Sequence, residues 1–153
     1  QIGTPEDIIN NPANDYVRSF FKGVDVTSVL SASHIVNKNR STVINKDSTG
    51  IKSALQIISD YDEDYAYFLE KNGKYIGILT LESLKEQQKS GGTIHDAVIK
   101  QDSIHEDQQI SDFISDIAKH EFPTAVTTEE GKYKGTISKG RLLKVFDEGV
   151  DNE

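Results

Sequence analysis

The sequence predicts an α/β fold of two β-α-β-β-α units, with small sheets packed together and a helical N-terminal extension in front. Two observations predict this fold: one phrase occurs twice, and an apolar helix pattern precedes each copy. The phrase KNGKYIG, residues 71–77, returns as EEGKYKG in residues 129–135. A single unit would leave one face of its sheet open, whereas two such units can cover each other. The repetition therefore has a packing explanation.

The first helix of each unit is predicted from the spacing of its apolar residues. Positions i, i+3, i+4 and i+7 fall on one face of a helix, which is the pattern of a helix packed against a core. Ser48-Thr49-Gly50 and Asp107 precede the two helices and are the expected N-caps. The apolar stripes are Ile51, Ala54, Leu55 and Ile58 in the first unit, and Ile110, Phe113, Ile114 and Ile117 in the second.

The strands are predicted from alternating aromatic and β-branched residues and from turn dipeptides between them. Asn72-Gly73 and Glu130-Gly131 are the expected hairpin turns. A second helix follows each hairpin, over residues 81–90 and 139–148, with Thr80 and Ser138 as N-caps. The expected strand segments are 41–47, 65–73 and 74–81 in the first unit, and 102–107, 124–131 and 132–138 in the second.

The composition argues against several classes of protein. The chain has no Cys, so it offers neither disulfides nor thiolate metal ligands. A net charge of -8 argues against nucleic acid as a partner. No stretch approaches the roughly 18 apolar residues of a membrane-spanning helix. Because the chain begins with Gln1 and contains no Met, we expect it to be a piece of a longer protein.

No catalytic or metal-binding constellation stands out. Residues 135–140, GTISKG, have the outer spacing of a phosphate-binding loop, but Arg141-Leu142 follows where Lys and Ser or Thr are required. Asp60, Asp62 and Asp64 have calcium-loop spacing without the Gly and the final Glu that such a loop needs. The four His residues lack the spacing of metal ligands. We therefore expect no enzyme, no catalytic residue and no metal site.

Two phrases resemble the CBS domain, namely GILTLESL in residues 77–84 and GTISKGRL in residues 135–142. Two in tandem resemble a CBS pair, or Bateman module. QIGTPEDIINNPAN in residues 1–14 resembles the end of the ATPase subunit of ABC importers. The combination resembles the C-terminal part of the ATPase subunit of glycine betaine/proline-type osmoprotectant importers. It implies an ATPase tail and linker in 1–30, CBS domains in 31–91 and 92–149, and an acidic tail in 150–153.

The resemblance also implies a role and a set of partners. The chain would be a regulatory module that controls the importer, located in the cytoplasm at the inner face of the cell membrane. Its partners would be a second copy in a homodimer, the parent ATPase domain, the membrane permease subunit and a small nucleotide, with no nucleic acid. No cofactor would be required. The ligand that the resemblance implies is cyclic di-AMP, bound between CBS units at a dimer interface, or another adenine nucleotide.

The expected ligand site follows from the pattern G-h-h-[ST]-x-x-D of nucleotide-binding CBS domains, where the hydroxyl residue contacts phosphate and the Asp holds the ribose. Thr80 and Ser138 match the hydroxyl, but Ser83 and Arg141 stand at the Asp position. Lys139 beside Arg141 makes the second site cationic, which suits a ligand rich in phosphate. The predicted nucleotide-binding residues are Val43, Thr80, Phe122, Thr124, Ala125, Ile137, Ser138, Lys139 and Arg141.

A structural alternative explains the same residues. Thr80 and Ser138 are then only N-caps, and Arg141 is a solvated helix residue. The pair would in that case be a ligand-free dimerisation module, or an ionic-strength sensor of the same transporter. The sequence leaves this alternative open beside ligand binding.

Overall fold

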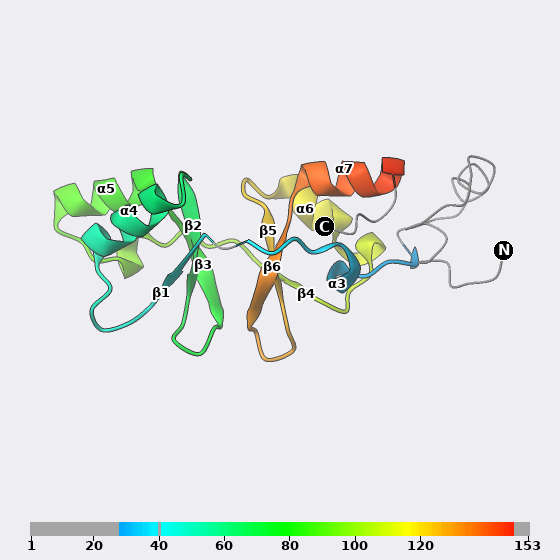
Figure 1. The fold of residues 1–153 in the computed structure, drawn as a ribbon, viewed down its shortest axis with the longest axis horizontal. Coiled ribbons are helices and arrows are strands. Elements are labelled where there is room, and N and C mark those ends of the chain that lie inside the picture. Colours follow the sequence, from blue (N-terminus) through cyan, green and yellow to red (C-terminus); the bar gives the residue numbers. More distant parts are fainter. Residues whose placement is uncertain (1–27, 40, 149–153) are drawn as a thin grey trace. The chain divides into compact units, whose positions relative to one another are not determined.

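The computed structural model describes residues 28–39 and 41–148 and shows two three-stranded sheets, each with its own helices (Figure 1). The chain divides into two compact units that do not follow chain order. Among the described residues, unit 1 holds 28–37, 104–126 and 136–148, and unit 2 holds 38–103 without residue 40, together with 127–135. The predicted N-terminal helical extension lies outside the described residues, and the domain boundaries read from the resemblance stay a prediction.

Unit 2 contains the sheet of strand order β1-β2-β3. β1 (Thr42–Ile44) runs parallel to β2 (Tyr65–Leu69), which pairs antiparallel with β3 (Tyr75–Thr80). α4 (Ile51–Asp60) and α5 (Leu81–Ser90) lie beside this sheet, and a short 3-10 helix, η2 (His95–Ala97), follows (Figure 1). Its core consists of Val43, Ala54, Ile58, Ala66, Phe68, Leu79, Leu84, Ile94 and Ala97. The predicted order of elements is confirmed here.

Unit 1 contains most of the sheet of strand order β4-β5-β6, made by β4 (Ile104–His105), β5 (Thr124–Thr127) and β6 (Tyr133–Ile137). α6 (Ile110–Lys119) and α7 (Lys139–Glu148) occupy their predicted places. A four-residue helix, α3 (Ala32–Ile35), was not predicted. The core comprises Leu30, Ala32, Ile35, Ile104, Ile110, Phe113, Ile117, Val126, Ile137, Leu142 and Val145.

The helix ends follow ordinary capping chemistry. The Thr80 hydroxyl accepts from the backbone N–H of Ser83 at 2.9 Å, and the Ser83 hydroxyl accepts from the Thr80 N–H at 3.1 Å. This reciprocal pair satisfies two donors at the start of α5. Gly91 ends α5 at φ +80°, a left-handed conformation that glycine adopts without strain. Gly50, within the expected Ser48–Gly50 stretch, is the N-cap of α4.

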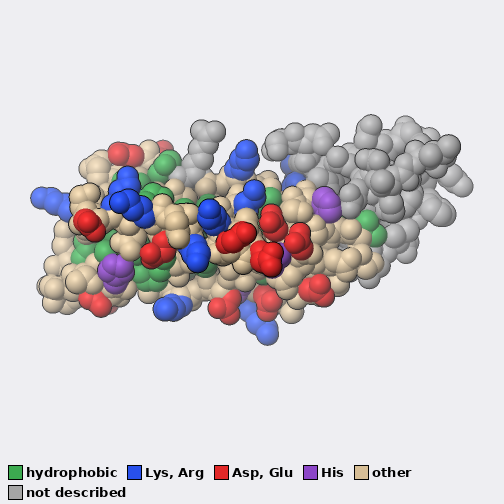
Figure 2. All heavy atoms as spheres, turned by 90° about the horizontal axis from the view of Figure 1, so that it is seen from below, with side chains coloured by type: hydrophobic (Ala, Val, Ile, Leu, Met, Phe, Trp, Pro, Cys, Tyr) green, Lys and Arg blue, Asp and Glu red, His purple; other side chains and the backbone are tan. Residues whose placement is uncertain are grey.

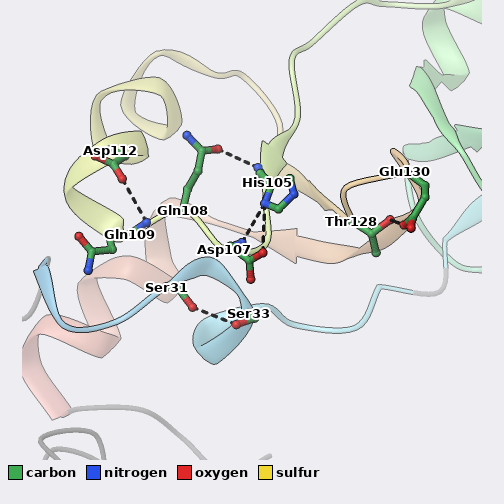
Figure 3. A network of polar contacts seen from close by, with 9 residues as sticks. All are labelled: Ser31, Ser33, His105, Asp107, Gln108, Gln109, Asp112, Thr128 and Glu130. Carbon is green, nitrogen blue, oxygen red and sulfur yellow. Dashed lines mark hydrogen bonds and ion pairs between the residues drawn. The ribbon is translucent and has the colours of Figure 1, made fainter.

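The predicted N-cap of α6 was wrong, since Gln109 rather than Asp107 holds that position. The loop before α6 is closed by its own polar contacts (Figure 3). The Asp107 N–H donates to Nδ1 of His105 at 3.1 Å, and the His105 N–H donates to Oε1 of Gln108 at 2.8 Å. Asp107 is therefore part of the loop, and the Asp112 carboxylate accepts from the Gln109 N–H at 3.3 Å instead.

Two short bridges attach a further segment of the chain to each sheet. In unit 1, Asn37 and Thr136 exchange backbone hydrogen bonds, both 2.9 Å long. In unit 2, Ile78 and Ile99 do the same, at 2.9 and 2.8 Å. The segment before β1 thus pairs with β6, and the segment after η2 pairs with β3. Asn37 thus extends the sheet of β4, β5 and β6, and Ile99 extends the sheet of β1, β2 and β3.

The repeated phrase pairs with itself inside unit 2. The Tyr75 N–H donates to the Gly131 carbonyl at 3.1 Å, and the Tyr133 N–H donates to the Gly73 carbonyl at 3.0 Å. The ring of Tyr133 stacks on that of Tyr67 with centroids 5.4 Å apart. The tyrosine of each copy therefore donates to the glycine carbonyl of the other copy, and the two copies of the phrase contact each other directly.

The described surface carries charged side chains of both signs. On the face shown in Figure 2, Asp and Glu side chains are interspersed with Lys and Arg side chains. The exposed large hydrophobic residues among those described are Tyr61, Leu143 and Phe146. Leu143 and Phe146 lie three residues apart on α7 and therefore share one face of that helix. No helix in the described part of the chain is long and apolar enough to cross a membrane.

Candidate functional site

A hollow of about 240 Å³ lies in unit 1 where α7 begins. Three segments build it: the end of α6, the loop that leads to β5, and the junction of β6 with α7. It combines apolar walls, one acidic, one basic and one imidazole side chain. The lining residues are Ile117, His120, Glu121, Phe122, Pro123, Ile137, Ser138, Lys139 and Gly140.

Ser138 starts α7 at the edge of this hollow. Its hydroxyl accepts from the Arg141 N–H at 3.0 Å, and its carbonyl accepts from the Leu142 N–H at 3.2 Å. The predicted N-cap role is therefore confirmed. The N-terminus of a helix presents backbone N–H groups and a positive dipole end, which together suit an anion. Lys139 is exposed and adds a full positive charge at the same place.

His120 is fixed in the wall of the hollow. Its backbone N–H donates to the Asp116 carbonyl at 3.2 Å, which closes the last turn of α6. Its ring Nδ1 lies 2.8 Å from the hydroxyl of Thr124, a fully buried residue of β5. The sequence suggested Thr124 as a wall for adenine. In the structure, Thr124 instead contacts the imidazole of His120, and His120 lines the hollow.

Arg141 is 8% exposed, although it is a charged residue on a helix. Its Nε donates to the carbonyl of Ile35 at 2.9 Å, at the end of α3. The alternative that makes Arg141 a solvated helix residue is therefore wrong. Its predicted contact with phosphate stays a prediction, and a guanidinium that holds an interior carbonyl has limited freedom to make it.

The other predicted site residues are placed in different ways. Phe122, Ile137, Ser138 and Lys139 come together in the hollow. Val43 and Thr80 belong to unit 2, where Val43 is fully buried in the core and Thr80 caps α5. Ala125 is fully buried in β5, like Thr124. Their proposed roles in ligand binding stay predictions.

Sequence reasoning missed five lining residues. Ile117 was assigned to the buried stripe of α6, and Gly140 has no side chain to attract notice. The remaining three, His120, Glu121 and Pro123, lie in the short connection between α6 and β5. The order of the elements could have indicated them. β5 follows this connection and β6 precedes α7, and the two strands are neighbours in one sheet, as a predicted hairpin requires, so the connection lies near the start of α7.

A second hollow, of about 610 Å³, lies in unit 2 between the β1–α4 connection and the segment after α5. None of its residues was predicted to bind a ligand. Its lining is Asn45, Lys46, Asp47, Thr49, Gly50, Ile51, Gly92, Thr93, Ile94 and His95. Within residues 28–39 and 41–148, no group of three or more His, Asp or Glu residues is arranged to hold a metal ion.

Known sequences relate the chain to transport proteins, while no protein-family model matches it. Over 158 residues it is 39% identical to the glycine betaine/proline betaine transport system ATP-binding protein ProV of Escherichia coli, covering 99% of this chain and 39% of that protein. It is 28% identical over 144 residues to the glycine betaine transport ATP-binding protein OpuAA of Bacillus subtilis, covering 94% and 34%. The chain thus spans well under half the length of these relatives, and matches their C-terminal region.

Solved structures decide the fold. A CBS domain pair/ACT domain protein of Thermotoga maritima superposes with a TM-score of 0.64 at 20% identity, over 78% of this chain and 98% of that one. The chain has the fold of a CBS-domain pair. Staphylococcus aureus OpuCA matches this CBS pair with a TM-score of 0.63 at 15% identity, over 72% and 94% of the two chains. CbpB, solved in complex with c-di-AMP, matches it with a TM-score of 0.67 at 15% identity, over 88% and 93%.

These findings confirm the recognition and the fold class that the sequence predicted. The CBS pair has two three-stranded sheets with helices, as expected. Its homologues are ATP-binding proteins of glycine betaine transport systems.

Proposed function

We propose that the CBS pair is the regulatory module of an ATPase subunit in an osmoprotectant ABC importer, and that it binds an adenine nucleotide where α7 begins. The observation that carries the proposal is the hollow in which Ser138 and Lys139 meet the apolar side chains of Phe122 and Ile137. Cyclic di-AMP is the first candidate, because CbpB has the same fold and was solved with c-di-AMP. CBSX2, a further structural neighbour, was solved with AMP.

The chemistry of the hollow fits the two ends of a nucleotide. A phosphate at the start of α7 would accept from backbone N–H groups and meet the Lys139 ammonium. An adenine ring would lie against Phe122 and Ile137, where its apolar faces leave water. Since cyclic di-AMP carries two adenosine halves, one half occupies this hollow and the other extends toward a second copy of the chain.

Binding regulates transport only if the ligand distinguishes two states of the transporter. The coupling free energy equals the difference in binding free energy between the states. In this proposal ATP hydrolysis belongs to the parent domain and the solute path to a membrane permease subunit. The CBS pair lies with them at the cytoplasmic face of the membrane, and its role there is regulatory rather than catalytic.

The test is a calorimetric titration of the chain with cyclic di-AMP, AMP and ATP. We expect saturable heat with cyclic di-AMP, and at least about tenfold weaker binding by Lys139→Glu, because a charge-assisted hydrogen bond contributes roughly 1.5–3 kcal/mol. Lys85→Glu on α5 is the matched control, since Lys85 is exposed and the change in charge is identical. Equal weakening in both variants would point to long-range charge instead of a contact.

Arg141→Asp is a less informative variant for the same question. It removes a cation near the hollow, but it also breaks the hydrogen bond to Ile35. A loss of affinity would then have two explanations. No heat and no thermal shift with any of the three nucleotides would contradict ligand binding and favour a dimerisation module.

We also propose that the CBS pair is a homodimer. The specific observation is the apolar face of α7, where Leu143 is 69% exposed and Phe146 is 39% exposed. Large apolar side chains left in water at neighbouring positions commonly mark an interaction site. A second copy is the simplest occupant, because a twofold axis brings the same face of both copies together.

A further inference from the structure

The hollow at the start of α7 contains a carboxylate for which the proposed function has no role. Glu121 is exposed and lines the hollow together with Ser138 and Lys139. A negative charge in a phosphate site is unfavourable unless it meets hydrogen-bond donors of the ligand. Glu121 therefore favours a ligand that carries hydrogen-bond donors as well as an anion.

The two residues at the expected ribose position have other partners in the structure. The Ser83 hydroxyl donates to the Thr80 carbonyl at 3.2 Å and accepts from the Thr80 N–H at 3.1 Å. Nε of Arg141 donates to the Ile35 carbonyl at 2.9 Å. A guanidinium has no acceptor atom, so Arg141 has none to offer a hydroxyl. The carboxylate that the ribose requires must come from another segment.

We propose that Glu121 is the ribose-binding carboxylate of this site, an inference that rests on the proposed function. Glu121 lies between two fixed points of the α6–β5 connection. On one side, His120 is tied to Asp116 through its backbone and to Thr124 through its ring. On the other side, Pro123 restricts the backbone of the connection. Glu121, which lines the hollow, thus belongs to a segment whose backbone is already held.

The arrangement sets a preference for one class of ligand. A carboxylate accepts strong, charge-assisted hydrogen bonds from hydroxyl groups, while Lys139 and the start of α7 meet the phosphate. Inorganic phosphate or sulfate has an anion and no sugar hydroxyl, so Glu121 repels it without compensation. The site therefore selects ribonucleotides over simple anions and over deoxyribonucleotides.

The experiment compares ligands that differ only in the sugar. Each ribose of cyclic di-AMP has one free hydroxyl, at the 2′ position, and the 2′-deoxy analogue has none. We expect the unaltered chain to bind cyclic di-AMP about tenfold more tightly than the deoxy analogue, and Glu121→Ala to bind both equally. Glu121→Ala should also bind the deoxy analogue at least as tightly as the unaltered chain does. Glu121→Asp, which keeps the carboxylate, should retain part of the preference.

Glu129→Ala is the matched control, because Glu129 is an exposed glutamate in the β5–β6 turn, outside the lining of the hollow. It should leave the preference for ribose unchanged. The inference is overturned if the unaltered chain binds the two ligands equally, or if Glu121→Ala keeps the full preference. In both outcomes nucleotide binding itself survives. Absence of binding by the unaltered chain overturns the proposed function and this inference together.

Discussion

At the scale of single residues, position in the chain and role in the fold are only loosely connected. Ser138 behaves as its place at the start of a helix suggests, because N-cap chemistry is local. Arg141, three residues later, has a partner in Ile35, which is far away in the sequence. Local roles could be predicted from the sequence, whereas the burial of Arg141 depends on a tertiary contact that no local pattern encodes.

Arg141 should matter for stability, and its exposed neighbour should not. We expect Arg141→Met to lower the free energy of unfolding by about 1.5–3 kcal/mol, because the buried Ile35 carbonyl loses a charged donor. Lys139→Met, on an exposed side chain, should change it by less than about 0.5 kcal/mol. Urea unfolding followed by circular dichroism measures both. A stability of Arg141→Met equal to that of the unaltered chain would show that the contact with Ile35 contributes nothing.

The buried tyrosines of unit 2 predict a loss of stability in alkali. Burial raises the pKa of Tyr67 well above its ordinary value of about 10, so the folded chain keeps this phenol neutral. The unfolded chain ionises it above pH 10 and binds fewer protons, so stability is full below pH 10 and falls as the pH rises further. One such tyrosine lowers the free energy of unfolding by about 1.4 kcal/mol between pH 9 and pH 11.

Tyr67→Phe should therefore lose less stability between these two pH values than the unaltered chain, by about that amount. Urea midpoints at pH 9 and pH 11 provide the comparison. Tyr61→Phe is the control for the removal of a phenol hydroxyl, because Tyr61 is 43% exposed. Identical pH dependence in all three proteins would contradict the burial of a neutral phenol at Tyr67.

At the scale of elements, periodicity predicted the regular parts and missed the irregular ones. α4 and α6 occur where the apolar stripes placed them, because one apolar face of each helix packs against a core. α3 and the bridge between Asn37 and Thr136 have one turn or one residue pair each, too short for any period to show. The hollow at α7 lies among such short connections, which is why only part of its lining could be predicted.

The glycines at the ends of α5 and α7 should respond to alanine with opposite sign. Gly91→Ala should destabilise by about 1–2 kcal/mol, because φ is +80° there and an added Cβ has open space, leaving only backbone strain. Gly140→Ala should stabilise by up to about 1 kcal/mol, because Gly140 lies within α7 and its nearest neighbour would be 3.9 Å from the Cβ. Thermal unfolding of both variants tests this prediction. Melting temperatures that change in the same direction in both variants would contradict it.

At the scale of the whole molecule, the large hydrophobic side chains that are exposed in the described part of the chain are Tyr61, Leu143 and Phe146. Acidic and basic side chains both lie on the face in Figure 2, and the full chain has a net charge of -8. Against this background the apolar pair on α7 stands out. The resemblance implied a homodimer, and the structure adds which apolar residues of α7 face solvent: Leu142 and Val145 are buried, and Leu143 and Phe146 are exposed.

Association of two copies should therefore depend on this face of α7. Burying one large apolar side chain contributes about 1.5–3 kcal/mol to the free energy of association, and in a twofold-symmetric dimer each such residue occurs twice. We expect Leu143→Lys to weaken dimerisation at least about a hundredfold, since it removes two apolar contacts and places two like charges together. Sedimentation equilibrium at tens of micromolar measures it. Tyr61→Lys, at an exposed aromatic on the other unit, is the control and should leave association unchanged. A single species of 17.0 kDa for the unaltered chain would contradict the homodimer, and a dimer unaffected by Leu143→Lys would place the interface on another surface.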